Sequence, residues 1–339
     1  MNIIEHVKLI NFRSHSTLSL CCHKPTTLII GENGSGKTSV IEAIYLALRG
    51  KSFKATDPEI CKRDTLFYCI EITFSDHTKT LVRYNGSYKE FEIATQKSRR
   101  LGTKHRYPII LFEPDDLHLI SSSPIRRRDY FDHLFAQMDE SYNLALRRYT
   151  KALKQRNDLL KTTTATPDNI FSWDIMLAHY GVEIAAKRQA NTKNINRQLT
   201  NIYREIAQNQ DECELIHHPT PETEDCYLEN LTKNFQKDLR HGHTTFGIHR
   251  DNYIFKFNQV LADGSASRGE IRSIILALKF IEAALLHQSL GKNPLILLDD
   301  TFSELDEARQ THLINNFKDH QIIITSTSTP RNLPVDIKL

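Results

Sequence analysis

A glycine-rich segment near the N-terminus has the spacing of a loop that holds the phosphates of a nucleotide. It reads GENGSGKT over residues 31–38 and fits the pattern G-x-x-x-x-G-K-S/T, between the apolar stretch TTLII and a helical pattern that begins near Lys37. Backbone N–H groups of such a loop point at phosphate oxygens, and the N-terminus of the following helix favours the same negative charge. Lys37 is expected to reach the β- and γ-phosphates, and the Thr38 hydroxyl to bind Mg²⁺. The sequence therefore predicts that ATP and Mg²⁺ bind here, through Gly31, Glu32, Asn33, Gly34, Ser35, Gly36, Lys37 and Thr38.

Two adjacent carboxylates could complete this site from a distant part of the chain. The stretch PLILL at 294–298 predicts a buried strand, and Asp299 follows at its C-terminal end, where ligands gather in parallel sheets. We expect Asp299 to be a second Mg²⁺ ligand with Thr38, and Asp300 to orient or deprotonate the attacking water. The aspartate side chain is one methylene shorter than that of a glutamate. We therefore expect Asp300 to act through an intervening water and ATP turnover to be slow. The alternative interpretation is a strand that ends in an acidic turn.

Hydrophobic periodicity predicts the elements that position these groups. Alternation in 66–74, 79–84 and 88–94 predicts an antiparallel meander. Residues from about 123 to 208 are rich in helix formers with amphipathic spacing, and predict helices of about 20 to 35 residues. A second helical pattern runs from Ile271 to Leu285, and Ser267 fits its N-cap.

Length and composition agree with a folded protein of about two domains. The chain has 339 residues, of which 40% are hydrophobic and 25% charged. The longest apolar runs are strand-sized, so no membrane-spanning helix is expected. Glu5, His6 and Lys8 interrupt the N-terminus where a secretory signal needs an apolar core, which predicts a cytoplasmic protein. The net charge of +3 indicates little about partners.

The order of motifs resembles the ATP-binding-cassette (ABC) head shared by transporters, SMC proteins and DNA-repair ATPases. The phosphate loop is followed by SRGE at 267–270, the acidic strand end, SELD at 303–306, and a last apolar strand. The resemblance implies that SRGE is the signature motif, which completes the site of a partner subunit, and that SELD is the D-loop. It also places Arg13, in LINFRSH, near the nucleotide. The residues so implied are Arg13, Ser267, Gly269, Glu270 and Asp306.

Two departures narrow this resemblance. Transporter heads usually carry a glutamine and a histidine where this chain reads LFEPDDL and ITSTST, so a transporter subunit is disfavoured. Only about 260 residues separate Lys37 from Asp299, too few for the long arms of SMC proteins. The expected fold is α/β: an ABC-type P-loop ATPase head with an antiparallel β meander, made from 1–122 and 243–339, and a short helical arm domain over 123–242.

Further segments resemble the RecF family of bacterial recombination mediators along nearly the whole chain. They are FEPDDL, SPIRRRDYFD, YTKALKQRNDLLK, the WD pair at Trp173 and Asp174, GIHRD and the paired aspartates. The resemblance implies a weak, DNA-stimulated ATPase that dimerises on ATP and binds duplex DNA beside single-stranded gaps. It also implies work with RecO and RecR in gap repair and replication-fork maintenance, with slow hydrolysis as the release step. The alternatives are another SMC-like repair ATPase or, less favoured, a transporter's nucleotide-binding subunit.

Basic residues gather in three clusters that could contact DNA phosphates. The clusters cover 97–106, 126–128 and 147–156. Such runs are often solvated helix faces, which is the alternative for each of them. We expect Arg126, Arg127 and Arg128 to bind DNA, because they open a helix directly after FEPDDL and could move with the nucleotide.

Overall fold

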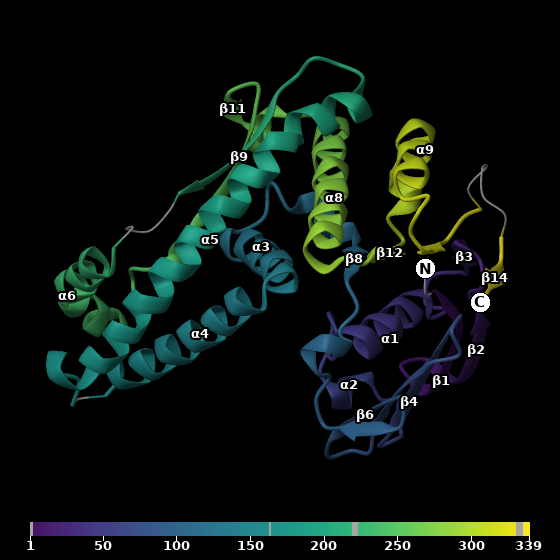
Figure 1. Cartoon of the computed structure of the whole chain (residues 1–339), viewed down its shortest axis with the longest axis horizontal. Helices are drawn as coiled ribbons and strands as arrows, with labels where there is room; N and C mark the ends of the chain where they lie inside the picture. Colours follow the sequence, from purple (N-terminus) through teal and green to yellow (C-terminus); the bar gives the residue numbers. More distant parts are fainter. Residues whose placement is uncertain (1–2, 163, 219–222, 330–334) are drawn as a thin grey trace. The chain divides into compact units, whose positions relative to one another are not determined.

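The computed structural model describes residues 3–162, 164–218, 223–329 and 335–339, and the chain divides into two units (Figure 1). Unit 1 contains 1–116 and 283–339, and unit 2 contains 117–282. The boundary between unit 2 and the C-terminal segment of unit 1 therefore lies inside helix α8 (Arg268–Leu290). The sequence predicts that the head resumes at residue 243, whereas residues 243–282 group with unit 2 in the structure. We propose that unit 1 is the ATPase head and that unit 2 contains the arm.

A five-stranded parallel sheet in unit 1 carries the two predicted phosphate-site strands. Its order is β14-β3-β13-β12-β8, and each neighbouring pair is parallel. The predicted strand TTLII is β3, and the predicted strand before Asp299 is β12, which begins one residue later than expected. Because the strands are parallel, the C-terminal ends of β3 and β12 lie at the same edge, separated by β13. The bounds are β3 Thr26–Ile30, β8 Ile109–Phe112, β12 Leu295–Asp299, β13 Ile322–Ser326 and β14 Ile337–Lys338.

An antiparallel sheet forms the second layer of unit 1. Its order is β2-β1-β4-β5-β6-β7, and β4 to β6 are the predicted meander. Helix α1 (Lys37–Arg49) contacts strands of both sheets and is buried around nearly its whole circumference from Val40 to Leu48, as a helix between two layers must be. The strands are β1 Ile4–Phe12, β2 His15–Cys21, β4 Tyr68–Phe74, β5 Lys79–Tyr84, β6 Lys89–Ile93 and β7 Gln96–Ser98. The shorter helices are α2 Asp57–Ile60 and α9 Glu307–Asn316.

Unit 2 is mainly helical, as the sequence predicts for most of it. Its helices are α3 Pro124–Met138, α4 Glu140–Leu160, α5 Pro167–Ala207, α6 Glu224–His241, α7 Ala262–Ser265 and the first part of α8. A sheet of order β11-β10-β9 joins them, with β9 Cys213–His218, β10 Asn252–Phe257 and β11 Val260–Leu261. The predicted helix length was too short for α5, which has 41 residues. Buried positions such as Ile184, Ile195 and Leu199 continue along it until Gln208 ends the helix in a left-handed conformation.

Two buried arginines join the elements of unit 2. Arg188 on α5 is 1% exposed and donates hydrogen bonds to both carboxylate oxygens of Asp132 at 2.8 Å and to Asp251 Oδ2 at 2.9 Å. Arg156 on α4 bonds in the same way to Asp174 Oδ1 (2.5 Å) and Asp238 Oδ2 (2.7 Å). Each guanidinium therefore holds two carboxylates that come from other segments. This gives a structural role to the WD and GIHRD segments, which supply Asp174 and Asp251.

We expect Arg188→Met to lower the free energy of unfolding by about 3–5 kcal/mol, because it leaves two carboxylates without their buried counter-charge. Arg197→Met is the matched control, since Arg197 is exposed on the same helix and bonds only to nearby Asn194 in the described contacts. Urea unfolding of both variants measures the difference. Equal stability of the two variants would contradict the buried role of Arg188.

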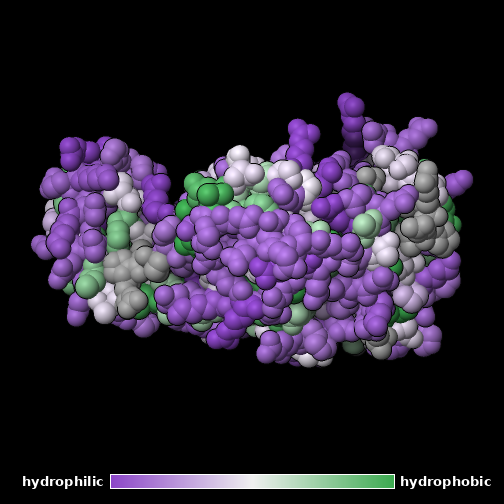
Figure 2. All heavy atoms as spheres, turned by 90° about the horizontal axis from the view of Figure 1, so that it is seen from above, coloured by the Kyte–Doolittle hydropathy of each residue, from purple (hydrophilic) through white to green (hydrophobic). Residues whose placement is uncertain are grey.

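One helix of the described chain, α8, is long and apolar enough to cross a membrane by length and composition. Of the most apolar 18-residue stretch of this helix, 72% is buried, as is typical of a core helix. The face drawn in Figure 2 is dominated by hydrophilic residues, with hydrophobic residues in small patches.

Candidate nucleotide-binding site

The predicted phosphate loop connects β3 to α1, and two of its glycines, Gly34 and Gly36, have left-handed backbone conformations that favour glycine. Gly36 is the N-cap of α1 with φ 94°, and a Cβ atom there would lie 2.2 Å from His15 Nε2. The loop borders a hollow of about 600 Å³, so a ligand can reach its backbone. The lining residues are Arg13, Ser14, Asn33, Gly34, Gly36, Lys37, Thr38, Ser39, Glu59, Cys61 and Asp300.

Lys37 is held over the loop by the backbone of the loop itself. Its side chain is 4% exposed, and Nζ donates hydrogen bonds to the carbonyl oxygens of Gly31 at 2.9 Å and Glu32 at 3.0 Å. The same Nζ lies 3.7 Å from Asp300 Oδ2. The ammonium is thus fixed between the start of the loop and the end of β12. A cation held here can neutralise phosphate charge in a partly desolvated place, where charge-assisted hydrogen bonds are strong.

The two predicted Mg²⁺ ligands are in direct contact. Thr38 Oγ1 donates to Asp299 Oδ1 at 2.7 Å, and Thr325 Oγ1 on β13 donates to the same oxygen at 3.1 Å. Hard oxygen ligands of this kind, few in number and completed by phosphate and water, suit Mg²⁺. The Ser35 hydroxyl oxygen is buried and has no hydrogen-bond partner among the described residues, so a phosphate oxygen could satisfy it. The loop, the metal ligands and this hydroxyl therefore fit a Mg²⁺–nucleotide complex.

Asp300 follows β12 in a left-handed backbone conformation with φ 51°, which aspartate tolerates better than most residues. Its N–H donates to Thr325 Oγ1 at 3.1 Å. Burial is the main cause that raises the pKa of the Asp300 carboxyl, nearby Lys37 opposes the shift, and the neighbouring carboxylate of Asp299 adds to it. A carboxylate with a raised pKa accepts a proton more readily than an ordinary aspartate, which supports its predicted role toward water.

Arg13 lines the same hollow as the phosphate loop, while its position near a nucleotide stays a prediction, and its contacts lead to residues that sequence analysis missed. Its guanidinium donates to both carboxylate oxygens of Glu42 on α1 at 2.8 Å. Glu42 is 1% exposed and also accepts a hydrogen bond from Ser52 Oγ at 2.5 Å. A charged residue inside the apolar run VIEAIYLAL was the available signal for such a partner. Lys54, whose Nζ lies 3.2 Å from Asp299 Oδ2, belongs to no motif and had no signal.

The predicted signature and D-loop residues cap two helices. Ser267 and Glu270 form a capping box at the start of α8, in which the Ser267 N–H donates to Glu270 Oε2 at 2.6 Å and the Glu270 N–H donates to Ser267 Oγ at 3.3 Å. This confirms Ser267 as the N-cap. Gly269 lies in the first turn of the same helix, in unit 2. Asp306 in unit 1 caps α9 by accepting from the Arg309 N–H at 2.9 Å. The action of these residues on a partner subunit stays a prediction.

The arginines predicted to bind DNA lie half-buried in the first turns of α3. Arg127 donates from Nε and Nη2 to Asn252 Oδ1 at 3.2 and 2.9 Å, and Arg128 Nη1 donates to the Asp251 carbonyl oxygen at 2.6 Å. Both guanidinium groups therefore help to hold unit 2 together. Arg156, from the third basic cluster, is buried between two carboxylates.

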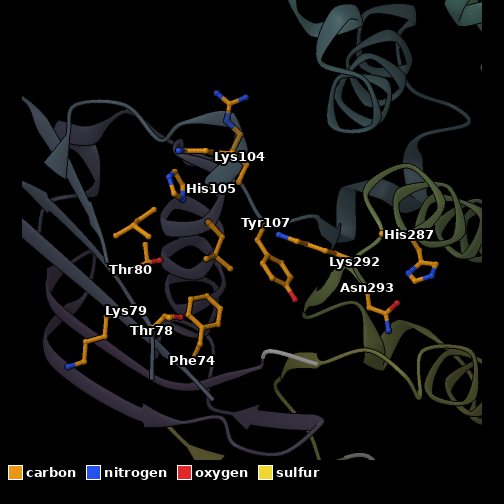
Figure 3. A pocket seen from close by; sticks show the side chains of 14 residues that line it. Phe74, Thr78, Lys79, Thr80, Lys104, His105, Tyr107, His287, Lys292 and Asn293 are labelled. Carbon is orange, nitrogen blue, oxygen red and sulfur yellow. The ribbon is translucent and has the colours of Figure 1, made fainter. Parts of the chain in front are cut away.

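A second hollow of unit 1, of about 660 Å³, includes Leu48 near the C-terminal end of α1 and collects basic side chains (Figure 3). Lys104 and His105 reach it from one side, and His287 and Lys292 from the other. Phe74 and Tyr107 also line it, and their stacked rings have centroids 6.3 Å apart. Among the described residues, no Asp or Glu lines it. Part of the first basic cluster thus shares this hollow with Lys292 of the C-terminal segment.

Comparison with known proteins agrees with this geometry. An AAA domain family model matches residues 6–214. The DNA replication and repair protein RecF of Natranaerobius thermophilus is 36% identical over 97% of this chain and 92% of its own length. The RecF protein of Alkaliphilus oremlandii is 32% identical over 96% and 93%, respectively.

Solved structures extend the likeness to three dimensions. A structure described as "the recombination mediator protein RecF-ATPrS in RecFOR pathway" has a TM-score of 0.89 and 27% identity, over 99% of this chain and 95% of that one. An SMC head from Pyrococcus furiosus, at a TM-score of 0.52, 16% identity, and coverage of 97% of this chain and 90% of that one, shares the fold alone. The predicted α/β, ABC-type ATPase fold is confirmed. On the identity and coverage of these relatives, the chain belongs to the RecF family.

Proposed function

We propose that this protein is an ATP-dependent recombination mediator that binds DNA in the cytoplasm, where ATP binding closes a dimer on duplex DNA and slow hydrolysis releases it. The observation that carries the proposal is the contact of Thr38 with Asp299, beside Lys37 and Asp300, at one edge of the parallel sheet. The RecF relatives, which carry the name of DNA replication and repair proteins, support the DNA part. Partners follow from the same likeness: RecR, RecO and junctions between single- and double-stranded DNA.

The nucleotide step uses groups that the chain already holds in place. Lys37 binds the β- and γ-phosphates, helped by the backbone N–H groups of the loop and by the Ser35 hydroxyl. Thr38 and Asp299 would hold Mg²⁺, which neutralises charge that develops on the phosphates. Asp300 orients the attacking water and accepts its proton. Arg13, whose guanidinium is held by Glu42, lines the same hollow and is proposed to lie near the nucleotide.

The dimer step uses the exposed start of α8. Ser267 and Gly269 in unit 2 are proposed to meet the nucleotide held by a second copy of unit 1, with Glu270 holding Ser267 in place. Asp306 is proposed to lie at the same interface. Two copies related by a twofold axis would make both contacts at once, so each bound ATP joins two chains.

Duplex contacts are proposed for a stripe on α4 in addition to Arg126–Arg128. Arg147, Lys151 and Lys154 are exposed and lie four and three residues apart, so they share one helix face. Exposed cations at this spacing can follow a phosphate backbone without reading sequence. Because Arg127 and Arg128 also hold unit 2 together, their substitution tests DNA contact and folding at the same time. The α4 stripe avoids this overlap.

We expect the triple variant Arg147, Lys151, Lys154→Ala to bind duplex DNA at least about tenfold more weakly with ATP, and to lower the dependence of log K on log salt by roughly three units per subunit. The matched control replaces Lys233, Lys237 and Arg240 on α6, which are also exposed at the same spacing. Fluorescence anisotropy between 50 and 200 mM salt measures both. An unchanged salt slope in the α4 variant, or equal losses in the two variants, would exclude this stripe as the duplex contact.

A further inference from the structure

Lys54 occupies one side of the carboxylate that the proposed function assigns to Mg²⁺. It lies in the loop between α1 and α2, and its Nζ is 3.2 Å from Asp299 Oδ2. The other oxygen, Oδ1, accepts hydrogen bonds from Thr38 and Thr325. Both oxygens of the Asp299 side chain are therefore engaged by the chain itself.

Asp299 needs a counter-charge because it is almost completely buried. Its side chain is 3% exposed, and an ionised carboxylate in such a place is strongly disfavoured without a cation. Lys37 does not supply this charge, since its described ion pair is with Asp300 and its hydrogen bonds go to loop carbonyls. Among the described residues, the ion pair of Asp299 is with Lys54.

The backbone that carries Lys54 is fixed, while its side chain is not enclosed. The N–H groups of Lys54 and Ala55 donate to Ser52 Oγ at 2.9 and 3.1 Å, and Ser52 bonds to Glu42, the partner of Arg13. The Lys54 side chain itself is 39% exposed. An anchored loop with a partly exposed, four-carbon side chain can give up one charge partner without unfolding.

We propose that Lys54 is a placeholder cation, which neutralises Asp299 when no divalent cation is bound and is displaced from that carboxylate when the Mg²⁺–nucleotide complex binds. The inference rests on the proposed role of Asp299 as a metal ligand. Two cations cannot share one carboxylate without repulsion, so the ammonium and the metal ion compete. Lys54 therefore stabilises the metal-free protein and weakens the binding of the metal ion.

The test measures metal binding and not ATP hydrolysis. Mn²⁺ replaces Mg²⁺ as an oxygen-preferring ion that electron paramagnetic resonance can count. In the presence of ADP, Lys54→Met is expected to bind Mn²⁺ about tenfold more tightly than the wild type, which corresponds to a repulsion of about 1.4 kcal/mol. Without metal the variant is expected to melt at a lower temperature than the wild type, and added Mn²⁺ is expected to remove the difference.

Two controls make the outcomes separable. Lys51→Met removes an exposed lysine of the same loop and is expected to bind Mn²⁺ like the wild type. Lys54→Arg keeps the charge and is expected to do the same. Unchanged or weaker Mn²⁺ binding in Lys54→Met, with Asp299→Asn still losing the ion, overturns the placeholder role alone. Unchanged Mn²⁺ binding in Asp299→Asn would instead overturn the proposed metal site.

Discussion

Asp300→Asn is expected to bind ATP as the wild type does and to lose hydrolysis by about 10² or more, the contribution typical of a positioned proton acceptor. Asp299→Asn and Lys37→Ala are expected to lose productive binding of Mg²⁺ and ATP. The difference follows from geometry, because Asp299 contacts Thr38 at 2.7 Å, whereas Asp300 lies beyond it, 3.7 Å from Lys37. Isothermal titration calorimetry measures nucleotide binding, and the rate of phosphate release measures hydrolysis, so the two effects can be separated.

The control for these charge changes is Asp319→Asn, an exposed carboxylate of unit 1. It is expected to bind and hydrolyse ATP normally. Equal loss of nucleotide binding in Asp300→Asn and Asp299→Asn would show that the two carboxylates do not have separate roles.

Ser267→Arg is expected to bind ATP as a monomer, with no ATP-dependent dimer and with hydrolysis reduced to background. Ser267 is exposed at the start of α8. A large cationic side chain there is expected to keep the start of α8 from approaching the nucleotide that a second copy holds. Loss of the helix cap alone costs only about 1 kcal/mol and does not abolish folding. Sedimentation with and without ATP is the measurement.

A matched exchange separates the cap from the interface. Ser123 is an exposed serine that caps α3 in the same unit, where its side chain accepts from the Arg126 N–H. Ser123→Arg removes a cap with the same chemistry and is expected to dimerise with ATP. Dimerisation of Ser267→Arg to the wild-type extent would remove the proposed role of the signature motif.

Local sequence signals predicted the core of the site and its supporting elements. Two apolar runs of strand length, TTLII and PLILL, predicted strands, and the structure forms them as β3 and β12. The glycine spacing of GENGSGKT predicted a phosphate loop, and this segment connects β3 to α1. Alternation in the meander worked for the same reason, since strand faces repeat every two residues. The register of β12 and β13 then brings Thr325 to Asp299, which no local pattern indicates.

The remaining contacts join residues that are distant in sequence and carry no periodic signal. Arg188 meets Asp132 and Asp251, and Arg156 meets Asp238, across separate helices and strands. The same limit applies to Lys54, which looks like any surface lysine until β12 is placed beside its loop. For the basic clusters, sequence shows charge but not burial, so Arg128 and Arg156 could not be distinguished from exposed cations.

We propose that ATP binding, without hydrolysis, holds this protein on DNA. Asp300→Asn tests it most directly, because this variant is expected to keep ATP bound. Its affinity for a gapped duplex is measured with ATP and Mg²⁺ and again without nucleotide, at one fixed salt concentration. We expect a dimer to bind tightly only with ATP, and the complex to persist because hydrolysis is blocked. Equal DNA affinity with and without ATP would contradict it.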